Sequence, residues 1–164
     1  MYKRQALIGA CGDAARERWL PGIASGDTVV SVAYQEPGRR YQADPRDCRA
    51  MRDGGAWRLD GAKHLVWHGA AAHAWLVSAR GENGATLLLA VPADARGVRV
   101  TDTPTLDGAR CARLDFDAVP LGADALLAQG EAADAALAQA LQWGTACLLY
   151  TSQAVRSAAL RDAV

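Results

Sequence analysis

Residues 56–67 read AWRLDGAKHLVW, and this stretch carries the clearest local signal in the chain. Trp57 and Leu59 alternate with polar residues, which is typical of a half-buried strand. The Asp60-Gly61 pair that follows is a favoured two-residue hairpin turn. The stretch therefore predicts a β-hairpin whose second strand covers residues 63–67.

More short strands are predicted on both sides of this hairpin. The segments rich in β-branched or alternating apolar residues are 28–34, a stretch near 47–52, 74–79, 86–91, 98–100 and 111–116. The last of these is expected to end before Val119-Pro120. Seven or so short strands with turns every ~8–12 residues are typical of a barrel or sandwich.

Helices are predicted only at the two ends of the chain. The first covers residues 13–20, with Asp13 as N-cap and Pro21-Gly22 as the stop signal. The second runs from Glu131 to about residue 150. Its apolar face is formed by Leu137, Leu141, Gly144 and Leu148. The chain offers no obvious partner for that face, which predicts a fragment of a larger protein.

The composition bounds the class of protein. The chain has 164 residues, 51% of them apolar, so one folded domain with additional ends is expected. The 18 basic and 18 acidic side chains balance, which argues against nucleic acid or an anionic membrane as the main partner. No apolar run reaches the ~20 residues of a membrane span, and the N-terminus has no secretory pattern.

The cysteines predict a reducing compartment. Cys11, Cys48, Cys111 and Cys147 are widely separated and form no C-x-x-C pair. Because zinc sites built on cysteine need close pairs, neither a metal cluster nor a disulfide framework is predicted. We expect four reduced thiols in a cytoplasmic protein.

Three histidines, His64, His68 and His73, are the other candidate metal ligands. In a strand, His64 and His68 share a face but lie ~13 Å apart, at ~3.3 Å per residue, which is too far for one ion. We expect surface or loop histidines, with contact to a ligand as the alternative. Ser25 and Ser78 lie in no G-x-S-x-G elbow, and neither common phosphate-binding glycine loop is present.

Two features leave alternatives open. The pair Arg39-Arg40 follows Glu36-Pro37-Gly38 and is interpreted either as a solvated turn or as a contact to a phosphate-bearing ligand. Trp67 and Trp75 are interpreted either as barrel core or as a planar wall for a flat cofactor. The residues alone therefore predict a mainly β domain with a trailing helix, and a ligand site at its loops remains open.

Five segments, in order, resemble motifs of the acyl-CoA dehydrogenase family. They are RERWLPGIASG at 16–26, VAYQEPG at 32–38, AWRLDGAKHLVWHG at 56–69, AWLVSAR at 74–80, and LDFDAVP at 114–120 with DALL at 124–127. Each motif is weak alone. Their order and spacing over about residues 13–147 make the resemblance specific.

The resemblance implies a domain organisation. Residues 1–26 correspond to the end of an N-terminal helical region, 27–128 to the FAD- and acyl-CoA-binding middle β-barrel, and 129–164 to the first helix of a truncated C-terminal helical domain. Residues 1–5 and the tail from about residue 148 have no family counterpart. We interpret these two tips as sequence foreign to the family.

The resemblance also implies the binding residues. The flavin of FAD would meet backbone groups of Val32, Ala33, Tyr34, Gln35, Glu36, Leu65, Val66 and Trp67. Tyr41 falls where the family has a pantetheine-contacting Ser, and Arg39 and Arg40 would approach a phosphate of FAD or CoA. Gln35 stands for the family's Thr, Leu65 for Trp, and Trp67 for Ser or Thr. This pattern is similar to that of pimeloyl-CoA dehydrogenase small subunits, a divergent branch.

The implied reaction is the α,β-dehydrogenation of an acyl-CoA in fatty acid metabolism, with hydride transfer to FAD. The family's base lies on the C-terminal helical domain, so no catalytic residue is assigned in this chain, and the isolated chain is expected to be inactive. Implied partners are the acyl-CoA, an electron-transfer flavoprotein or similar acceptor, and further subunits in a homo- or hetero-oligomer. The alternative is a non-catalytic CoA- or flavin-binding barrel module.

Overall fold

The computed structural model describes residues 2–39 and 42–161, with side chains for residues 5–39 and 42–146. The helices are α1 (Tyr2–Ala10), α2 (Asp13–Ser25) and α3 (Glu131–Arg161), with short 3-10 turns η1 (Gly69–Ala71) and η2 (Ala123–Ala125). The strands are β1 (Val30–Ala33), β2 (Arg49–Asp53), β3 (Ala56–Trp67), β4 (Ala74–Arg80), β5 (Thr86–Pro92), β6 (Val98–Pro104), β7 (Arg110–Leu121) and β8 (Leu126–Gln129). The predicted mainly β fold with flanking helices is confirmed.

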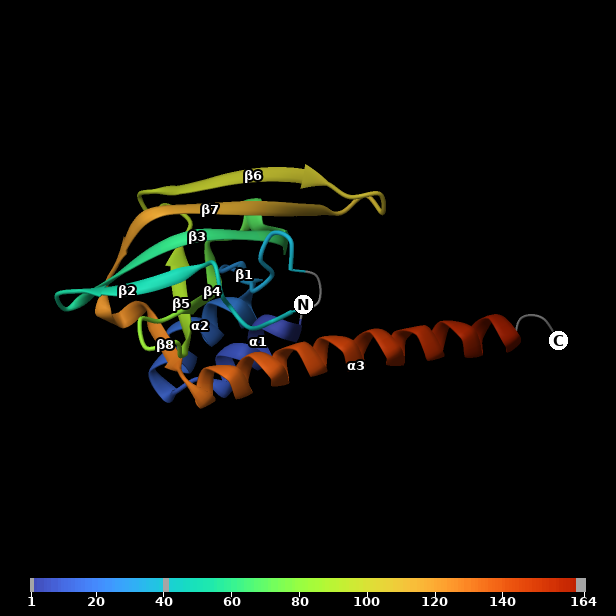
Figure 1. Ribbon diagram of the computed structural model, residues 1–164. Coiled ribbons are helices and arrows are strands. Elements are labelled where there is room, and N and C mark those ends of the chain that lie inside the picture. Colours follow the sequence, from blue (N-terminus) through green and yellow to red (C-terminus); the bar gives the residue numbers. More distant parts are fainter. Residues whose placement is uncertain (1, 40–41, 162–164) are drawn as a thin grey trace.

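All eight strands belong to one sheet that wraps around a core as a barrel. The order is β6-β7-β3-β2-β4-β5-β8, and β1 pairs in parallel with β4. The strands β6, β7, β3 and β2 form one layer, and β4 and β5 cross beneath them (Figure 1). The barrel core is filled by side chains from both layers, including Trp57, Leu59, Trp75, Leu89 and Leu114.

A second apolar cluster joins the barrel to the helices. It contains residues of the outer face of β1, β4 and β5 together with residues of α1, α2 and α3. The strands β4 and β5 are therefore buried on both faces, and only the last residue of each is exposed. This explains why both read as nearly continuous apolar runs rather than alternating patterns.

The hairpin prediction at Asp60-Gly61 was wrong. Residues 56–67 form one twelve-residue strand, and the β2–β3 hairpin turn instead lies at Gly54-Gly55. The pairing with β7 shifts between Leu59 and Gly61, where Asp60 lies opposite two residues of β7, so the extra residue of this β-bulge belongs to β7. Gly61 has φ +126°, and a Cβ there would lie 2.6 Å from the Cα of Cys48. The glycine is needed for close approach of two chain segments, not for a turn.

The ends of two other elements, β7 and α2, were also predicted wrongly. The strand β7 continues through Val119-Pro120 to Leu121. The helix α2 continues past Pro21 to Ser25, and its N-cap is Gly12 rather than Asp13. Proline in a helix removes a hydrogen bond and disturbs the preceding turn, but here the following residues are held by packing of the buried Ile23. The strand β8 and the helix α1 were not predicted.

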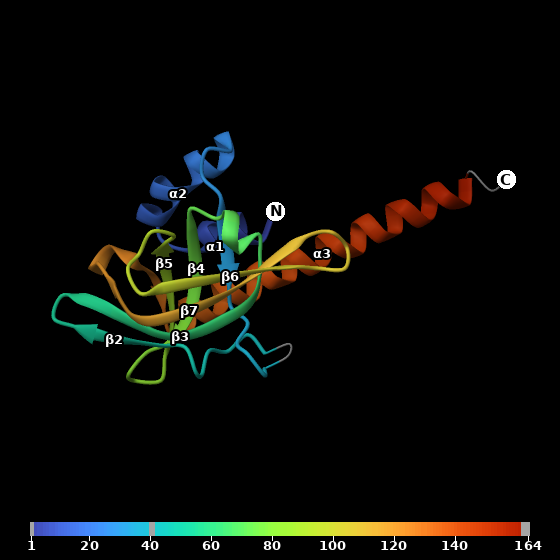
Figure 2. The same cartoon turned by 90° about the horizontal axis from the view of Figure 1, so that it is seen from above.

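The apolar face of α3 finds a partner within the chain. The helix α1 packs against α3, and α3 also contacts β5 and β8. Leu137 and Gly144 are buried and Leu141 is half-buried, whereas the side chain of Leu148 lies outside the described residues. The helix then continues away from the barrel, as both ribbon views show (Figures 1 and 2). The prediction that this helix lacks a partner was therefore wrong for its first turns.

Candidate functional site

The two segments predicted to meet a flavin lie side by side. The hydroxyl of Ser31 donates a hydrogen bond to the carbonyl of Trp67 at 2.8 Å, although 36 residues separate them. The N–H of His64 donates to the carbonyl of Gln35 at 2.9 Å. The end of β1 and its continuation through Glu36 are therefore fixed along the end of β3.

The side chains of these segments differ in exposure. Ala33, Glu36 and Val66 are buried, main chain included. Val32, Tyr34 and Gln35 are half-buried. Leu65 is 53% exposed and Trp67 is 51% exposed, which makes them the apolar surface of the site. Single exposed apolar side chains are ordinary. Leu65 and Trp67, however, both belong to the end of β3, which is hydrogen-bonded to the neighbouring β1 segment, and together they are called the apolar patch.

Leu65 owes its exposure to a bulge in β3. The pairing with β7 shifts between Lys63 and Val66, so one extra residue is inserted in β3 at this point. Leu65 has φ +50°, a left-handed conformation that is rare for a non-glycine residue. Such strain costs about 1–3 kcal/mol and is concentrated at functional sites. Here the bulge re-aims the strand end and turns the Leu65 side chain outward.

Behind the apolar patch lies a buried ion pair. The ammonium of Lys63 donates to Glu36 Oε1 at 3.0 Å, and both side chains are almost wholly inaccessible to solvent. Lys63 also donates to the hydroxyl of Ser78 at 3.2 Å and to the carbonyl of Tyr34 at 3.2 Å. The three N–H groups of the ammonium can therefore each reach an acceptor.

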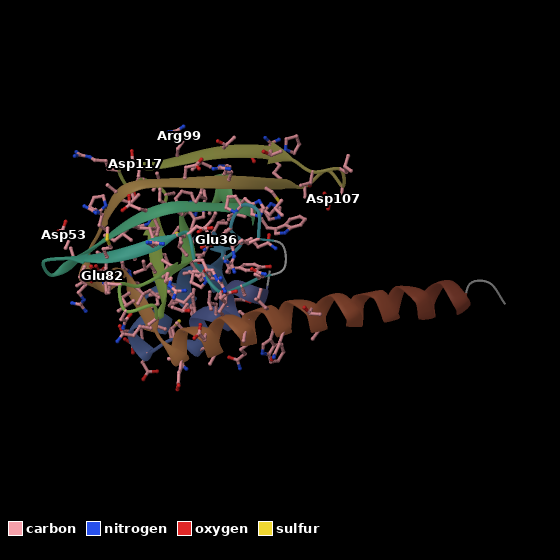
Figure 3. The ribbon with its side chains drawn as sticks, in the orientation of Figure 1. Glu36, Asp53, Glu82, Arg99, Asp107 and Asp117 are labelled. Atoms are coloured by element: carbon pink, nitrogen blue, oxygen red, sulfur yellow. The ribbon has the colours of Figure 1, made fainter. Side chains whose placement is uncertain are left out.

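The Glu36 carboxylate also accepts from the backbone. The N–H groups of Arg46, Asp47 and Cys48 donate to it at 3.0–3.2 Å. Burial alone would raise the pKa of Glu36, but the Asp47 N–H, the Lys63 charge and the Cys48 N–H lower that pKa below its usual value. Figure 3 shows Glu36 inside the molecule, whereas Asp53, Glu82 and Asp107 lie at peripheral turns. The carboxylate thus closes the loop that leaves at Pro37 and returns at Arg46.

The predicted substrate residues lie on this loop. Arg39 donates to both oxygens of Asp44, at 3.1 and 3.3 Å, and its side chain is 16% exposed. Asp44 also accepts from Arg46 at 3.2 Å. The charge of Arg39 is therefore already partly neutralised by a neighbour. Arg40 and Tyr41 lie outside the described residues.

The other candidate groups are dispersed. Nδ1 of His73 accepts a hydrogen bond from the Val29 N–H, whereas His64 and His68 lie on or beside the end of β3. Burial, with the nearby Arg113 charge, lowers the pKa of His64. Within the described part of the chain, no three His, Cys, Asp or Glu residues could hold a metal ion. The described helices include none that could cross a membrane.

The cysteines and tryptophans are placed as follows. Cys11, Cys48 and Cys111 are buried and unpaired, and burial raises the pKa of Cys48 to about 12. Thiols of this kind are unreactive. Trp75 belongs to the core and donates from Nε1 to the carbonyl of Gly69 at 2.8 Å. Trp75 is therefore barrel core, as the first interpretation expects. Trp67 is exposed, and its interpretation as a planar wall for a cofactor stays a prediction.

Sequence reasoning named Glu36 but missed Lys63 and Ser78 as parts of the site. A signal was available, because Lys63 is one of only two lysines in a chain with many arginines. It stands in a strand otherwise rich in buried apolar positions. A charged residue in such a strand needs a buried partner, and the sequence alone did not show which carboxylate reaches it.

Known proteins with similar sequences agree with this fold. The sequence profile described as acyl-CoA dehydrogenase, middle domain, matches residues 31–119. Acyl-CoA dehydrogenase FadE12 of Mycobacterium tuberculosis is 35% identical over 134 residues, which cover 77% of this chain and 34% of that protein. The chain thus spans about a third of the length of the curated relatives it matches.

Solved structures that resemble this chain include further acyl-CoA dehydrogenases. A glutaryl-CoA dehydrogenase from Mycobacterium smegmatis, in complex with FADH2, is 28% identical with a TM-score of 0.72, covering 82% of this chain and 36% of that one. The ChsE4-ChsE5 complex from Mycobacterium tuberculosis is 27% identical with a TM-score of 0.68, covering 77% and 34%. With more than half of its residues matched by the middle-domain profile, the chain belongs to the acyl-CoA dehydrogenase family.

Proposed function

We propose that this chain is the flavin- and acyl-CoA-binding barrel of a dehydrogenase that oxidises the α,β-bond of an acyl-CoA thioester. The observation that carries the proposal is the juxtaposition of the β1 extension with the strained end of β3, where Leu65 and Trp67 are exposed. In this proposal residues 27–128 are the binding barrel. Residues 1–26 belong to an N-terminal helical region, and residues 129–164 begin a C-terminal one.

The residues at this juxtaposition fit FAD in chemical character. The isoalloxazine ring is flat, with broad apolar faces and a polar edge of hydrogen-bonding groups. Leu65 and Trp67 supply an apolar surface, and backbone N–H groups within the segment Val32 to Glu36 would supply polar partners beside it. Bound FAD would supply the hydride acceptor of the reaction.

The chain's own residues would then orient the bound FAD and shield it from water. Leu65 and Trp67 exclude water from one side of the site, which strengthens the electrostatic interactions formed there. Backbone donors of the β1 extension fix orientation, since they do not depend on the side chains that differ from the family pattern. We assign the removal of the α-proton to a carboxylate outside this chain, so none of these residues is a catalytic base.

The substrate side of the proposal rests on the loop after Glu36. Because Arg39 is held by Asp44, we assign the main phosphate contact of FAD or CoA to Arg40, with Tyr41 beside the pantetheine. We further propose that the complete enzyme is an oligomer that passes electrons to an electron-transfer flavoprotein or a similar acceptor. A complex of two named chains is the subject of one related structure, ChsE4-ChsE5.

The test is a titration of the 15N-labelled chain with FAD, followed by amide chemical shifts. We expect the shifts to concentrate at residues 32–36 and 65–67, with Asp53 and Glu82 unchanged. Trp67→Ala should weaken binding about tenfold, because base–aromatic or ring stacking contributes about 1–3 kcal/mol. Trp143→Ala is the matched control, since Trp143 is 59% exposed but lies on α3. Amide shifts concentrated at other residues would contradict the proposal. An equal loss of FAD affinity in Trp67→Ala and Trp143→Ala would contradict it as well.

A further inference from the structure

Lys63 does more than neutralise Glu36. Its ammonium has three N–H groups and three acceptors: Glu36 Oε1, Ser78 Oγ and the carbonyl of Tyr34. The side chain is completely buried, so no water competes for these bonds. A buried ammonium with an unmet N–H loses free energy, so each acceptor is held in place. The Tyr34 carbonyl is the only main-chain acceptor among the three.

The Tyr34 carbonyl fixes the direction of a neighbouring donor. The described chain contains no cis peptide bonds. In a trans peptide the C=O and the following N–H lie in one plane and point in opposite directions. Because the Tyr34 carbonyl points inward to the Lys63 ammonium, the Gln35 N–H points away from it. The next peptide is fixed likewise, since the Gln35 carbonyl accepts from the His64 N–H.

The Gln35 N–H is left available. Among the described residues no acceptor within hydrogen-bond distance takes it, although the carbonyls on both sides of it are bonded. Gln35 itself is half-buried, beside the segment that ends with exposed Trp67. A backbone donor in such surroundings usually has a partner. The Gln35 N–H is therefore free to donate to an acceptor atom of a molecule that binds here.

We propose that Lys63 is a positioning residue, which turns the Tyr34–Gln35 peptide so that the Gln35 N–H donates to a ring carbonyl or ring nitrogen of the bound cofactor. The identity of that cofactor rests on the proposed function above. The orientation of the peptide does not, because it follows from contacts within the chain. Glu36 and Ser78 hold the ammonium at the right place, but neither touches this peptide through its side chain.

The orientation is measured without any ligand. Residual dipolar couplings of the 15N-labelled chain report the direction of each N–H bond. Lys63→Met keeps a linear apolar side chain and removes the donor to Tyr34, while Glu36 keeps its three backbone donors. We expect the Gln35 coupling to change, with the couplings of Val32 and Val66 retained. Ser78→Ala is the matched control, because it removes another partner of Lys63 and leaves the Tyr34 bond.

FAD titration provides the second readout. In Lys63→Met we expect the FAD-induced shift of the Gln35 amide to disappear and the affinity to fall about two- to tenfold, the range for one hydrogen bond. Shifts at Leu65 and Trp67 should persist. If Lys63→Met does not fold, the double variant Lys63→Met/Glu36→Gln removes both charges of the pair and is measured instead.

The outcomes separate the two proposals. An unchanged Gln35 coupling in the folded variant overturns the role of Lys63, whatever FAD does. A changed Gln35 coupling, combined with no FAD shifts at residues 32–36 or 65–67 in the unaltered chain, supports the peptide orientation and overturns the proposed function. Equal changes in Lys63→Met and Ser78→Ala would show a general loosening and also overturn the positioning role.

Discussion

Glu36 is the residue on which the local order of the site depends most. It joins β1, the returning loop and β3 through one carboxylate, which accepts from three backbone N–H groups and from Lys63. Such a pair adds little net stability over an apolar equivalent, because both charges lose their hydration. Breaking it is costly, because one buried charge is then left alone. The pair therefore specifies a geometry more than it stabilises the fold.

The first prediction concerns the pH dependence of stability. The folded-state pKa of Glu36 lies below its unfolded value, so the unfolded chain binds more protons as the pH falls. The contribution of Glu36 is fully present above the ordinary pKa of about 4.5 and is lost as the pH falls through the lower folded pKa. We expect the free energy of unfolding to decline below about pH 4.5. Urea denaturation at several pH values measures it.

Glu36→Gln tests the assignment. At pH 7 we expect Glu36→Gln to lower the free energy of unfolding by about 3–5 kcal/mol, because Lys63 remains buried without a counter-charge. We also expect the free energy of unfolding to decline less steeply in acid than in the unaltered chain. Glu82→Gln is the control, since Glu82 is exposed at the β4–β5 turn. An equally steep acid decline in Glu36→Gln would show that other carboxylates control it.

At the residue scale, sequence reasoning named two backbone segments that lie together in the fold, but not the contacts that hold them. The motif residues Val32 to Glu36 and Leu65 to Trp67 lie together in the fold. The partner of Lys63 could not be predicted, because Glu36 lies 27 residues away in the sequence and only the fold brings the two side chains together. The pairing of Arg39 with Asp44 was also missed, since a local loop conformation decides it.

At the scale of elements, Gly61 allows β3 to remain a single strand. It combines a positive φ with a close approach of the Asp47–Cys48 backbone. Replacement by Ala must both strain the backbone and displace the returning loop. A second glycine, Gly54, also has positive φ, but a Cβ there would meet nothing within 4 Å. A comparison of Ala substitutions at the two positions therefore separates the energetic cost of the left-handed conformation from that of a steric conflict.

We expect Gly61→Ala to cost about 2–4 kcal/mol and Gly54→Ala about 1 kcal/mol, the latter being the price of the left-handed conformation alone. Thermal or urea unfolding of the two variants measures the difference. Because residues 46–48 bind Glu36, Gly61→Ala should also change the amide shifts of that loop. Equal costs at both glycines would mean that the loop moves aside freely.

Element prediction succeeded where burial matched the pattern and failed where packing overrode a local signal. The strands β4 and β5 were correct because long apolar runs bounded by turns leave few alternatives. The Asp60-Gly61 pair has the composition of a turn, yet it lies within β3, opposite a bulge of β7. The strand β8 is short and half-buried, so its sequence gives little signal.

The contact between α1 and α3 leads to a third prediction. Leu137 is buried against a cluster that includes Leu7, Ile8 and Leu88. Leu137→Ala should destabilise the chain by about 2–4 kcal/mol through the cavity it leaves. Leu106→Ala is the control, because Leu106 is fully exposed at the β6–β7 turn. No difference between the two in urea unfolding would show that α3 is not part of the cooperative unit.

At the scale of the whole molecule, the barrel core and α3 differ in how much of their surface is covered. The barrel core is enclosed by its own strands, whereas α3 continues beyond the body to which its first turns are packed (Figure 2). Trp143, on the same helix, is 59% exposed beside α1. A barrel with its own core should therefore fold around the proposed site.

The last prediction follows from this division. The 164-residue chain should bind FAD weakly and turn over acyl-CoA below detection, because the described residues of the site supply an apolar surface and backbone donors but no assigned base. The measurement is reduction of an artificial electron acceptor with acyl-CoA and added FAD, using a complete acyl-CoA dehydrogenase as the positive control. Amide shifts on FAD addition, measured on the same sample, show whether the barrel is folded and able to bind. Binding without turnover is the expected combination, because in the proposed function the barrel provides the surface for the flavin and a carboxylate outside this chain removes the α-proton. Turnover comparable to that of the complete enzyme would show that a carboxylate of this chain acts as the base.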